Sequence, residues 1–213
     1  MLFRSIRVAA WVASVGSVKG QSYQDGLTEG MLSCGAVGKW TPEKEEEMTE
    51  EILRAASEKD SVGGRIECAV TGFPGGIGGG SFGSLEGKLS SLLYLIPAVK
   101  GVEFGAGFRL AAMRGSEAND PLRIEGDEVV FLKNDAGGIN GGLSNGNALT
   151  CAVAVRPTPS IGKKQLSVDL TKKQNTEIEI KGRHDACIVP RAVPVVEAAV
   201  AIALLDALSE EEK

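Results

Sequence analysis

The feature that most limits how this chain can fold is a nearly continuous apolar run, ALTCAVAV, at residues 148–155. A strand with water on one face alternates between apolar and polar side chains, whereas a strand covered on both faces does not. The run therefore predicts a strand inside a sheet, with other elements packed on both sides. That burial requires a layered arrangement of sheet and helices.

Several other segments have the pattern of strands. Residues 64–72 alternate, with Ile66, Cys68 and Val70 facing one way, which predicts a half-buried strand. Shorter strands are predicted at 100–105, 128–133, 165–170 and 176–181. Because helices and strands are mixed along 213 residues, we expect a single domain of α/β or α+β class, with a helical part at 1–60 and a core at 61–213.

Four segments have the spacing of amphipathic helices. They are 4–15, a segment from Thr41-Pro42 to about Glu58, a segment between 82 and 96, and 192–208. A short helix is also predicted at 107–113, followed by a polar loop at 114–121. The residues predicted to face inward are Val8, Val12 and Val15; Met48, Ile52, Leu53 and Ala56; Phe82, Leu85, Leu89, Leu92, Leu93 and Ile96; and Val195, Val196, Ala199, Ile202 and Leu205.

Composition narrows the class of function. The net charge is −5 and the pI about 5.1, which argues against a nucleic-acid partner or an acidic membrane surface. No segment has the roughly 18 consecutive apolar residues of a membrane span, so we expect no membrane partner. The 4 cysteines form no C-x-x-C pair and only 1 histidine could join them, so we expect no metal site and reduced thiols in the cytoplasm.

Two glycine-rich loops, GFPGGIGGGSFG at 72–83 and AGGINGGLSNG at 136–146, could direct backbone N–H groups at an anion. The first loop resembles a P-loop only in composition. The Gly87-Lys88 pair would need glycine at position 82 and serine or threonine at 89, where Phe82 and Leu89 stand. Tight turns are therefore the favoured interpretation of both loops.

Candidate site residues follow the apolar strand, in the sequence Arg156, Pro157, Thr158, Pro159 and Ser160. The two prolines fix the backbone, and an arginine with two hydroxyls suits a phosphate or the polar edge of a ring. A rigid exit loop without a ligand fits the composition equally well.

The segment GRHDA at 182–186 holds the only histidine of the sequence. In an extended backbone, Arg183 and Asp185 point to one side and His184 to the other. They could form an ion pair at a helix entrance. Alternatively, Arg183 binds an anionic ligand and Asp185 acts as an acid/base group or orients a cofactor. A serine–histidine–aspartate triad is excluded, because no serine nucleophile motif and no second histidine are present.

Six long motifs, in order, resemble those of the chorismate synthase family. They are FPGGIG, IPAVKGVEFGAGF, MRGSEANDP, NDAGGINGGLSNG, AVRPTPSI and GRHDACIVPRAVPVVEAAVAIALLDAL, and the resemblance covers residues 61–208 and also RVAA at 7–10. It implies a layered β-α-β sandwich and a homotetramer. The implied reaction is the 1,4-anti elimination of phosphate from 5-enolpyruvylshikimate 3-phosphate, which gives chorismate and requires reduced FMN, with NADPH as a possible reductant.

The resemblance also implies roles for single residues. Asp185 is similar to the carboxylate that manages a proton beside the flavin N5, and His184 is its neighbour in the catalytic segment. The residues similar to FMN-binding positions are Arg183, Arg156, Pro157, Thr158, Pro159, Ser160, Gly141, Pro97 and Ala98.

Three departures from the family pattern are visible. Arg156 stands where the family has lysine and keeps the positive charge, while Ala186 replaces a proline after Asp185. The family's N-terminal part, with two catalytic histidines and substrate-binding arginines, has no counterpart here. We therefore expect an N-terminally truncated member of the family. The alternative is a non-catalytic module that binds flavin or a phosphorylated ligand.

Overall fold

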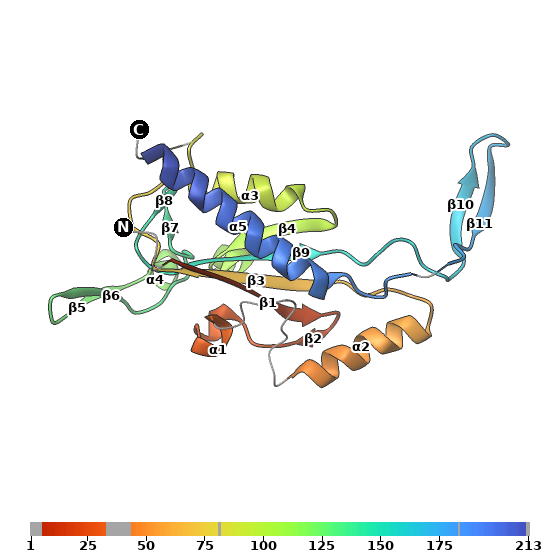
Figure 1. Ribbon diagram of the computed structural model, residues 1–213, viewed down its shortest axis with the longest axis horizontal. Coiled ribbons are helices and arrows are strands. Elements are labelled where there is room, and N and C mark those ends of the chain that lie inside the picture. The colour runs from red at the N-terminus through yellow and green to blue at the C-terminus, as the bar shows by residue number, and fades with distance from the viewer. Residues whose placement is uncertain (1–5, 33–43, 81, 183, 212–213) are drawn as a thin grey trace.

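An antiparallel five-stranded sheet forms the centre of the fold, in the order β2-β1-β3-β9-β4 (Figure 1). The computed structural model describes residues 6–32, 44–80, 82–182 and 184–211. Helices pack on this sheet, so the predicted α+β class and its layers are confirmed. The strands of the sheet are β1 (Arg7–Val15), β2 (Val18–Lys19), β3 (Gly64–Thr71), β4 (Val99–Phe104) and β9 (Leu149–Val155).

The apolar run at 148–155 forms β9, which pairs with β3 on one side and β4 on the other. All its residues except Ala154 are buried, as the sequence predicted. One face of the strand contacts the helix layer, and the other contacts a smaller cluster around Trp11 and Tyr23. The central strand is therefore covered on both sides.

Strand β3 is where predicted, but the prediction that one of its faces is exposed is wrong. Glu67 and Ala69 are 1% and 0% exposed, because the chain around Tyr23 covers this face. The Glu67 carboxylate accepts hydrogen bonds from Ser22 Oγ and from the Tyr23 backbone N–H, both at 2.8 Å. Arg65 Nε lies 3.1 Å from the same carboxylate. Burial nonetheless raises the pKa of Glu67 above its ordinary value of 4.5.

This raised pKa predicts a specific pH dependence of stability. Because the folded state holds the Glu67 proton more tightly than the unfolded state, its contribution is fully present below the ordinary pKa and is lost as pH rises through the folded pKa. Glu67→Gln should remove that loss. The melting temperature of the variant minus that of wild type should therefore increase as the pH rises from about 4 to about 7. Thermal denaturation across this range checks it. Glu125→Gln, at an exposed hairpin carboxylate, is the matched control, and parallel curves for all three proteins would contradict the prediction.

The predicted helix at 4–15 is wrong, since residues 7–15 form β1 and pair with β3. The register shifts between Val12 and Ser14, which marks a β-bulge. The extra residue puts Val12 and Val15 on the same face of the strand, although they are three positions apart in the sequence. This spacing imitates a helix in the sequence. Strands from the 1–60 and 61–213 parts therefore share one sheet and one core.

Helices α3 (Leu85–Leu95) and α5 (Val189–Glu211) lie side by side on one face of the sheet (Figure 1). The α3 helix buries Leu85, Leu89 and Leu93, as predicted, whereas Phe82 precedes the helix and is fully exposed. On α2 (Glu45–Ser57), Met48 is buried, but Leu53 and Ala56 are exposed, so the predicted inner face is only partly correct. The predicted start of this helix at Thr41-Pro42 lies outside the described residues.

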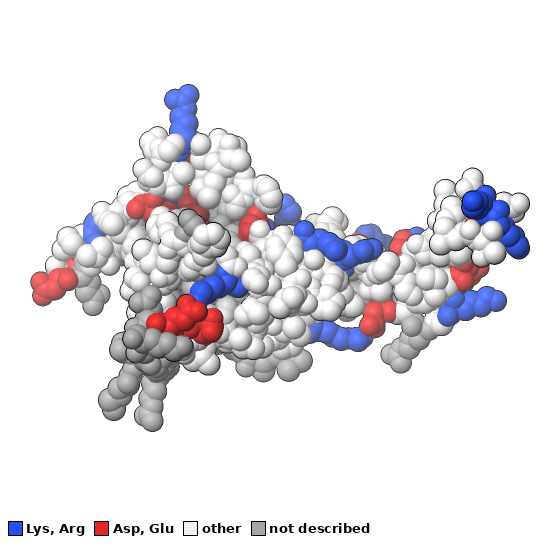
Figure 2. Space-filling view, turned by 90° about the horizontal axis from the view of Figure 1, so that it is seen from above, with Lys and Arg blue, Asp and Glu red and all other residues white. Residues whose placement is uncertain are grey.

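The inward face of α5 also differs from the prediction. Val196 is buried, but Val195, Ile202 and Leu205 are 47%, 59% and 59% exposed. The helix is apolar on most of its circumference, so the sequence does not determine which face turns inward. Uncharged atoms cover much of this side of the molecule (Figure 2). The buried residues of α5 are Val189, Val193, Val196, Val200, Ala203, Leu204 and Ala207.

Residues 189–210 of α5 are long and apolar enough, by length and composition alone, to cross a membrane. This segment was not predicted as a possible span, because charged residues interrupt its apolar run. In this fold one face of α5 packs against β1, β3 and α3, which is also the arrangement of a core helix in a layered domain.

Two hairpins extend from the sheet in opposite directions (Figure 1). The hairpin of β10 (Gln165–Asp169) and β11 (Gln174–Ile178) confirms the two strands predicted between 165 and 181. In the other hairpin, β5 (Leu122–Glu125) was not predicted. The short helix α4 (Gly115–Ala118) lies in the predicted polar loop. The predicted short helix at 107–113 is the 3-10 helix η4. The remaining elements are η2 (Tyr23–Asp25), α1 (Glu29–Leu32), η4 (Gly107–Ala112), β6 (Glu128–Phe131), β7 (Ile139–Asn140) and β8 (Leu143–Ser144).

The two glycine-rich loops pack against each other, backbone to backbone. A Cβ on Gly78 would lie 2.4 Å from the Gly142 carbonyl oxygen, and a Cβ on Gly142 would lie 2.4 Å from that of Gly79. Both Gly78 and Gly142 have positive φ. This close approach supports the interpretation of the loops as tight turns.

Candidate functional site

The segment after β9 and the segment before β4 meet at one end of the sheet. The Arg156 backbone N–H donates to the Ala98 carbonyl oxygen at 2.9 Å, and Val155 pairs with Val99. Ala98 has a φ of 72°, a left-handed conformation that is costly for a residue other than glycine. The structure therefore brings Pro97 and Ala98 next to the start of the 156–160 segment.

A third segment, at 184–186, joins the same end through the turn that precedes β3. The Val62 backbone N–H donates to the Ala186 carbonyl oxygen at 2.8 Å. Ser61 Oγ donates to the Thr158 carbonyl oxygen at 2.6 Å. Gly63 has no room for a side chain, since a Cβ would lie 2.4 Å from the Val155 carbonyl oxygen. These contacts hold segments that are distant in sequence around residues 156–160, the segment that follows β9 and forms the strand exit.

His184 contacts the strand exit directly. Its Nδ1 lies 3.1 Å from Ser160 Oγ, and its Nε2 lies 2.9 Å from the Ile180 carbonyl oxygen. A carbonyl oxygen can only accept, so Nε2 carries a proton, and in the neutral ring Nδ1 accepts from the Ser160 hydroxyl. This serine–histidine contact was not predicted, since the two residues are 24 positions apart.

Asp185 forms an ion pair with Arg191 in the first turns of α5, with 2.5 Å between Oδ1 and Nη2. The Asp185 side chain is 42% exposed and that of Arg191 is 71% exposed. Arg191 was not predicted as a site residue, although a basic residue six positions after the aspartate was a usable signal. Arg183, the other residue proposed beside Asp185, lies outside the described residues.

Gly141 does not join this group. It lies in the β7–β8 turn, whose Gly142 carbonyl oxygen accepts from the Leu85 N–H at the start of α3 at 2.9 Å. Pro97 follows the other end of α3, and a helix of 11 residues is about 16 Å long. Within one chain, Gly141 and the strand exit are therefore at opposite ends of the helix layer.

The strand exit has groups that suit an anionic, ring-containing cofactor such as FMN. Thr158 Oγ1 is buried and has no hydrogen-bond partner among the described residues. Arg156 is exposed, and its Nε donates to its neighbour's carbonyl oxygen rather than to any described carboxylate. A phosphate or a polar ring edge could satisfy both groups.

A cavity of about 350 Å³ opens beside His184, with room for part of such a ligand. It is lined by charged side chains of both signs and by backbone. Its lining residues are Ala56, Lys59, Asp60, Gly162, Glu179, Ile180, Lys181, Gly182, His184 and Ala186.

The fold and this strand exit define a layered α+β protein with a candidate anion-binding site at one end of its sheet. A solved crystal structure of chorismate synthase has the same fold, with a TM-score of 0.75 and 27% identity, over 97% of this chain and 58% of that chain. The chorismate synthase family model matches residues 1–209. This chain therefore belongs to the chorismate synthase family.

Relatives in the family are close in sequence. The chain is 47% identical to the chorismate synthase of Methanosarcina acetivorans over 206 residues, which is 94% of this chain and 55% of that protein. It is 53% identical to the chorismate synthase of Archaeoglobus fulgidus over 152 residues, which is 71% of this chain and 42% of that protein. The chain spans about half the length of the curated relatives it matches.

Proposed function

We propose that this chain supplies the flavin-binding side of a chorismate synthase site, a lyase of aromatic amino acid biosynthesis. The substrate would be 5-enolpyruvylshikimate 3-phosphate, which loses phosphate to give chorismate. The observation that carries the proposal is the meeting of three segments, at 97–98, 156–160 and 184–186, at the exit of β9, where the buried Thr158 hydroxyl has no partner among the described residues. The cofactor would be reduced FMN, with NADPH as a possible reductant, in a cytoplasmic homotetramer.

Four residues at or beside the strand exit have roles that their chemistry allows. Bound reduced FMN would supply electron density that assists loss of phosphate and a nitrogen that takes up the carbon-6 proton. Arg156 would place positive charge near the anionic ligand. Thr158 Oγ1 would gain a hydrogen-bond partner, and Asp185 would hold a proton beside the ring nitrogen. The Ser160 hydroxyl lies 3.1 Å from His184 Nδ1, and its oxygen would be an acceptor for a ring N–H.

Two predicted contacts need more than this strand exit. Arg183 would bind the cofactor beside Asp185. Gly141, at the other end of α3, would reach a flavin bound to another copy of the chain, which a homotetramer would provide. His184 is the only histidine of the sequence, and it belongs to the GRHDA motif. The two catalytic histidines expected from the family belong to its N-terminal part, so they have no counterpart in these 213 residues.

Binding of reduced FMN tests the proposal without requiring turnover. Arg156→Met should weaken the affinity about 10- to 100-fold, because a hydrogen bond to a charged group contributes about 1.5–3 kcal/mol. Arg123→Met, on the exposed hairpin β5, is the matched control and should bind like wild type. Anaerobic titration followed by flavin absorbance gives the dissociation constants.

The outcomes separate the candidate functions. Equal affinity in both arginine variants would contradict the proposed flavin site. If FMN binds at the strand exit, chorismate formation from 5-enolpyruvylshikimate 3-phosphate by the chain alone decides between the enzyme and the non-catalytic binding module.

A further inference from the structure

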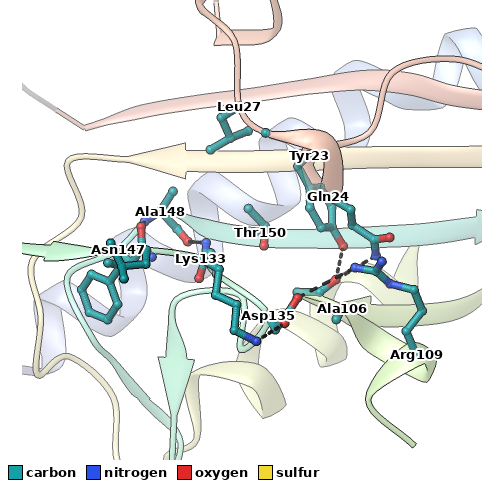
Figure 3. Close-up of a pocket in the computed structure, with 15 residues that line it drawn as sticks. Tyr23, Gln24, Leu27, Ala106, Arg109, Lys133, Asp135, Asn147, Ala148 and Thr150 are labelled. Carbon is teal, nitrogen blue, oxygen red and sulfur yellow. Dashed lines mark hydrogen bonds and ion pairs between the residues drawn. The ribbon is translucent and has the colours of Figure 1, made fainter. Parts of the chain in front are cut away.

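A second cavity lies on the face of the sheet opposite α3 and α5, between the η2 segment and the loop that precedes β7 (Figure 3). Its volume is about 370 Å³, which is near the lower end for ligand pockets and suits a small molecule. Thr150, which lines it, and Arg156 are six residues apart on and just after β9, so the two sites are about 20 Å apart along the strand. The polar side chains of its lining are Tyr23, Gln24, Arg109, Lys133, Asn134, Asp135, Asn147 and Thr150.

Two polar atoms at this cavity have no hydrogen-bond partner among the described residues. Thr150 is only 3% exposed, and its Oγ1 is unpaired. Asn134 donates from Nδ2 to the Ala148 carbonyl oxygen at 2.8 Å, while its Oδ1 is unpaired. A buried polar atom without a partner costs about 1–3 kcal/mol. A ligand hydroxyl could donate to Asn134 Oδ1, and another could pair with the Thr150 hydroxyl.

The cavity also has an excess of positive charge. Lys133 Nζ lies 2.5 Å from one oxygen of Asp135, and Arg109 Nη2 lies 3.9 Å from the other. Two cations therefore share one carboxylate at the same side of the cavity (Figure 3). An anionic group on a ligand would balance the remaining charge.

The wall that Tyr23 and Gln24 form is held in place before any ligand binds. Tyr23 Oη donates to the Gly105 carbonyl oxygen at 2.9 Å, and Gln24 Nε2 donates to the same oxygen at 3.2 Å. Burial raises the pKa of the Tyr23 hydroxyl, which therefore remains protonated and keeps this hydrogen bond. Because this wall is already ordered, less conformational entropy is lost when a ligand binds.

We propose that this cavity is a second ligand site, for a small anion that carries hydroxyl groups. A phosphate ester and a hydroxy carboxylate share this chemistry. The anionic group binds at Lys133 and Arg109, and the hydroxyl groups pair with Thr150 Oγ1 and Asn134 Oδ1. The site is separate from the strand exit and does not depend on the flavin proposal.

Calorimetric titration of the 213-residue chain with four probes tests the chemistry. Glycerol 3-phosphate and glycerate combine an anion with hydroxyl groups, whereas inorganic phosphate and glycerol each carry one feature alone. One of the first two should bind at least about tenfold more tightly than either of the others, because one hydrogen bond contributes up to about 1.5 kcal/mol. The tighter of the two identifies the anionic group.

Two substitutions locate the bound probe. Thr150→Val should weaken its binding about tenfold, and it should not lower the melting temperature of the free protein, because the unpaired hydroxyl is removed. Lys133→Met should weaken binding at least about tenfold, since a charged hydrogen bond is lost. Thr176→Val and Lys172→Met, on the β10–β11 hairpin, are the matched controls and should bind like wild type.

Any of three results would overturn the proposal. The first is that no probe binds. The second is that glycerol or inorganic phosphate binds as tightly as the combined probes. The third is binding that neither Thr150→Val nor Lys133→Met weakens, because the ligand would then lie elsewhere.

Discussion

Under the proposed function, Asp185→Asn should lower the rate of chorismate formation by about 10²–10⁴, the usual contribution of a positioned acid or base. The amide cannot hold and release a proton, but it keeps the size of the carboxyl group, so the affinity for reduced FMN should stay close to wild type. The lost ion pair with Arg191 is exposed and contributes about 1 kcal/mol or less to stability. Anaerobic assays with 5-enolpyruvylshikimate 3-phosphate and reduced FMN give the rate.

A second readout does not depend on turnover. A carboxylate beside the bound flavin disfavours the flavin's anionic form, so Asp185→Asn should lower the pKa of bound reduced FMN. The absorbance of the complex as a function of pH measures this pKa. Asp169→Asn, in the β10–β11 hairpin, is the matched control. An unchanged rate and an unchanged flavin pKa in Asp185→Asn would contradict the role proposed for this residue.

Gly105→Ala should have the largest effect on stability, because the end of β4 touches the second glycine-rich loop. A Cβ on Gly105 would lie 2.1 Å from the Asp135 carbonyl oxygen and 2.4 Å from the Gly137 nitrogen, and the φ of Gly105 is +53°. Backbone strain and overpacking together should cost about 3–5 kcal/mol. For a chain of this size the melting temperature should fall by about 6–20 °C.

Gly115→Ala is the control for Gly105→Ala. A Cβ at Gly115, in α4, would meet nothing within 4 Å, and the free energy of unfolding should change by about 0.5 kcal/mol or less. Thermal and urea denaturation of both variants provide the comparison. Similar stability in the two variants would show that the Gly105 loop contact is not rigid.

The predictable part of the fold rests on local pattern. The strand β9 could be predicted because its apolar side chains have no period, and α3 because Leu85, Leu89 and Leu93 are at helical spacing. The strand β1 was missed because a bulge between Val12 and Ser14 imitates a helical spacing. A bulge depends on the partner strand, which the sequence of β1 does not specify.

The candidate site, too, could be predicted only where it depends on local sequence. Long motifs in the sequence identified the family and named the strand-exit residues. They did not predict that Ser160 would contact His184, or that Arg191 would pair with Asp185. Nor did they indicate the cavity around Thr150, because its walls come from segments more than 100 residues apart.

The sequence by itself determined a mixed class of helices and strands, the central strand and the family, because each depends on residue types at fixed local spacing. The tertiary structure alone decided which face of α5 is buried, that Glu67 is covered, and that Gly141 lies away from Arg156. The physical reason is that these properties depend on which segments pack together. Packing is a property of pairs of distant segments, and no single segment carries it.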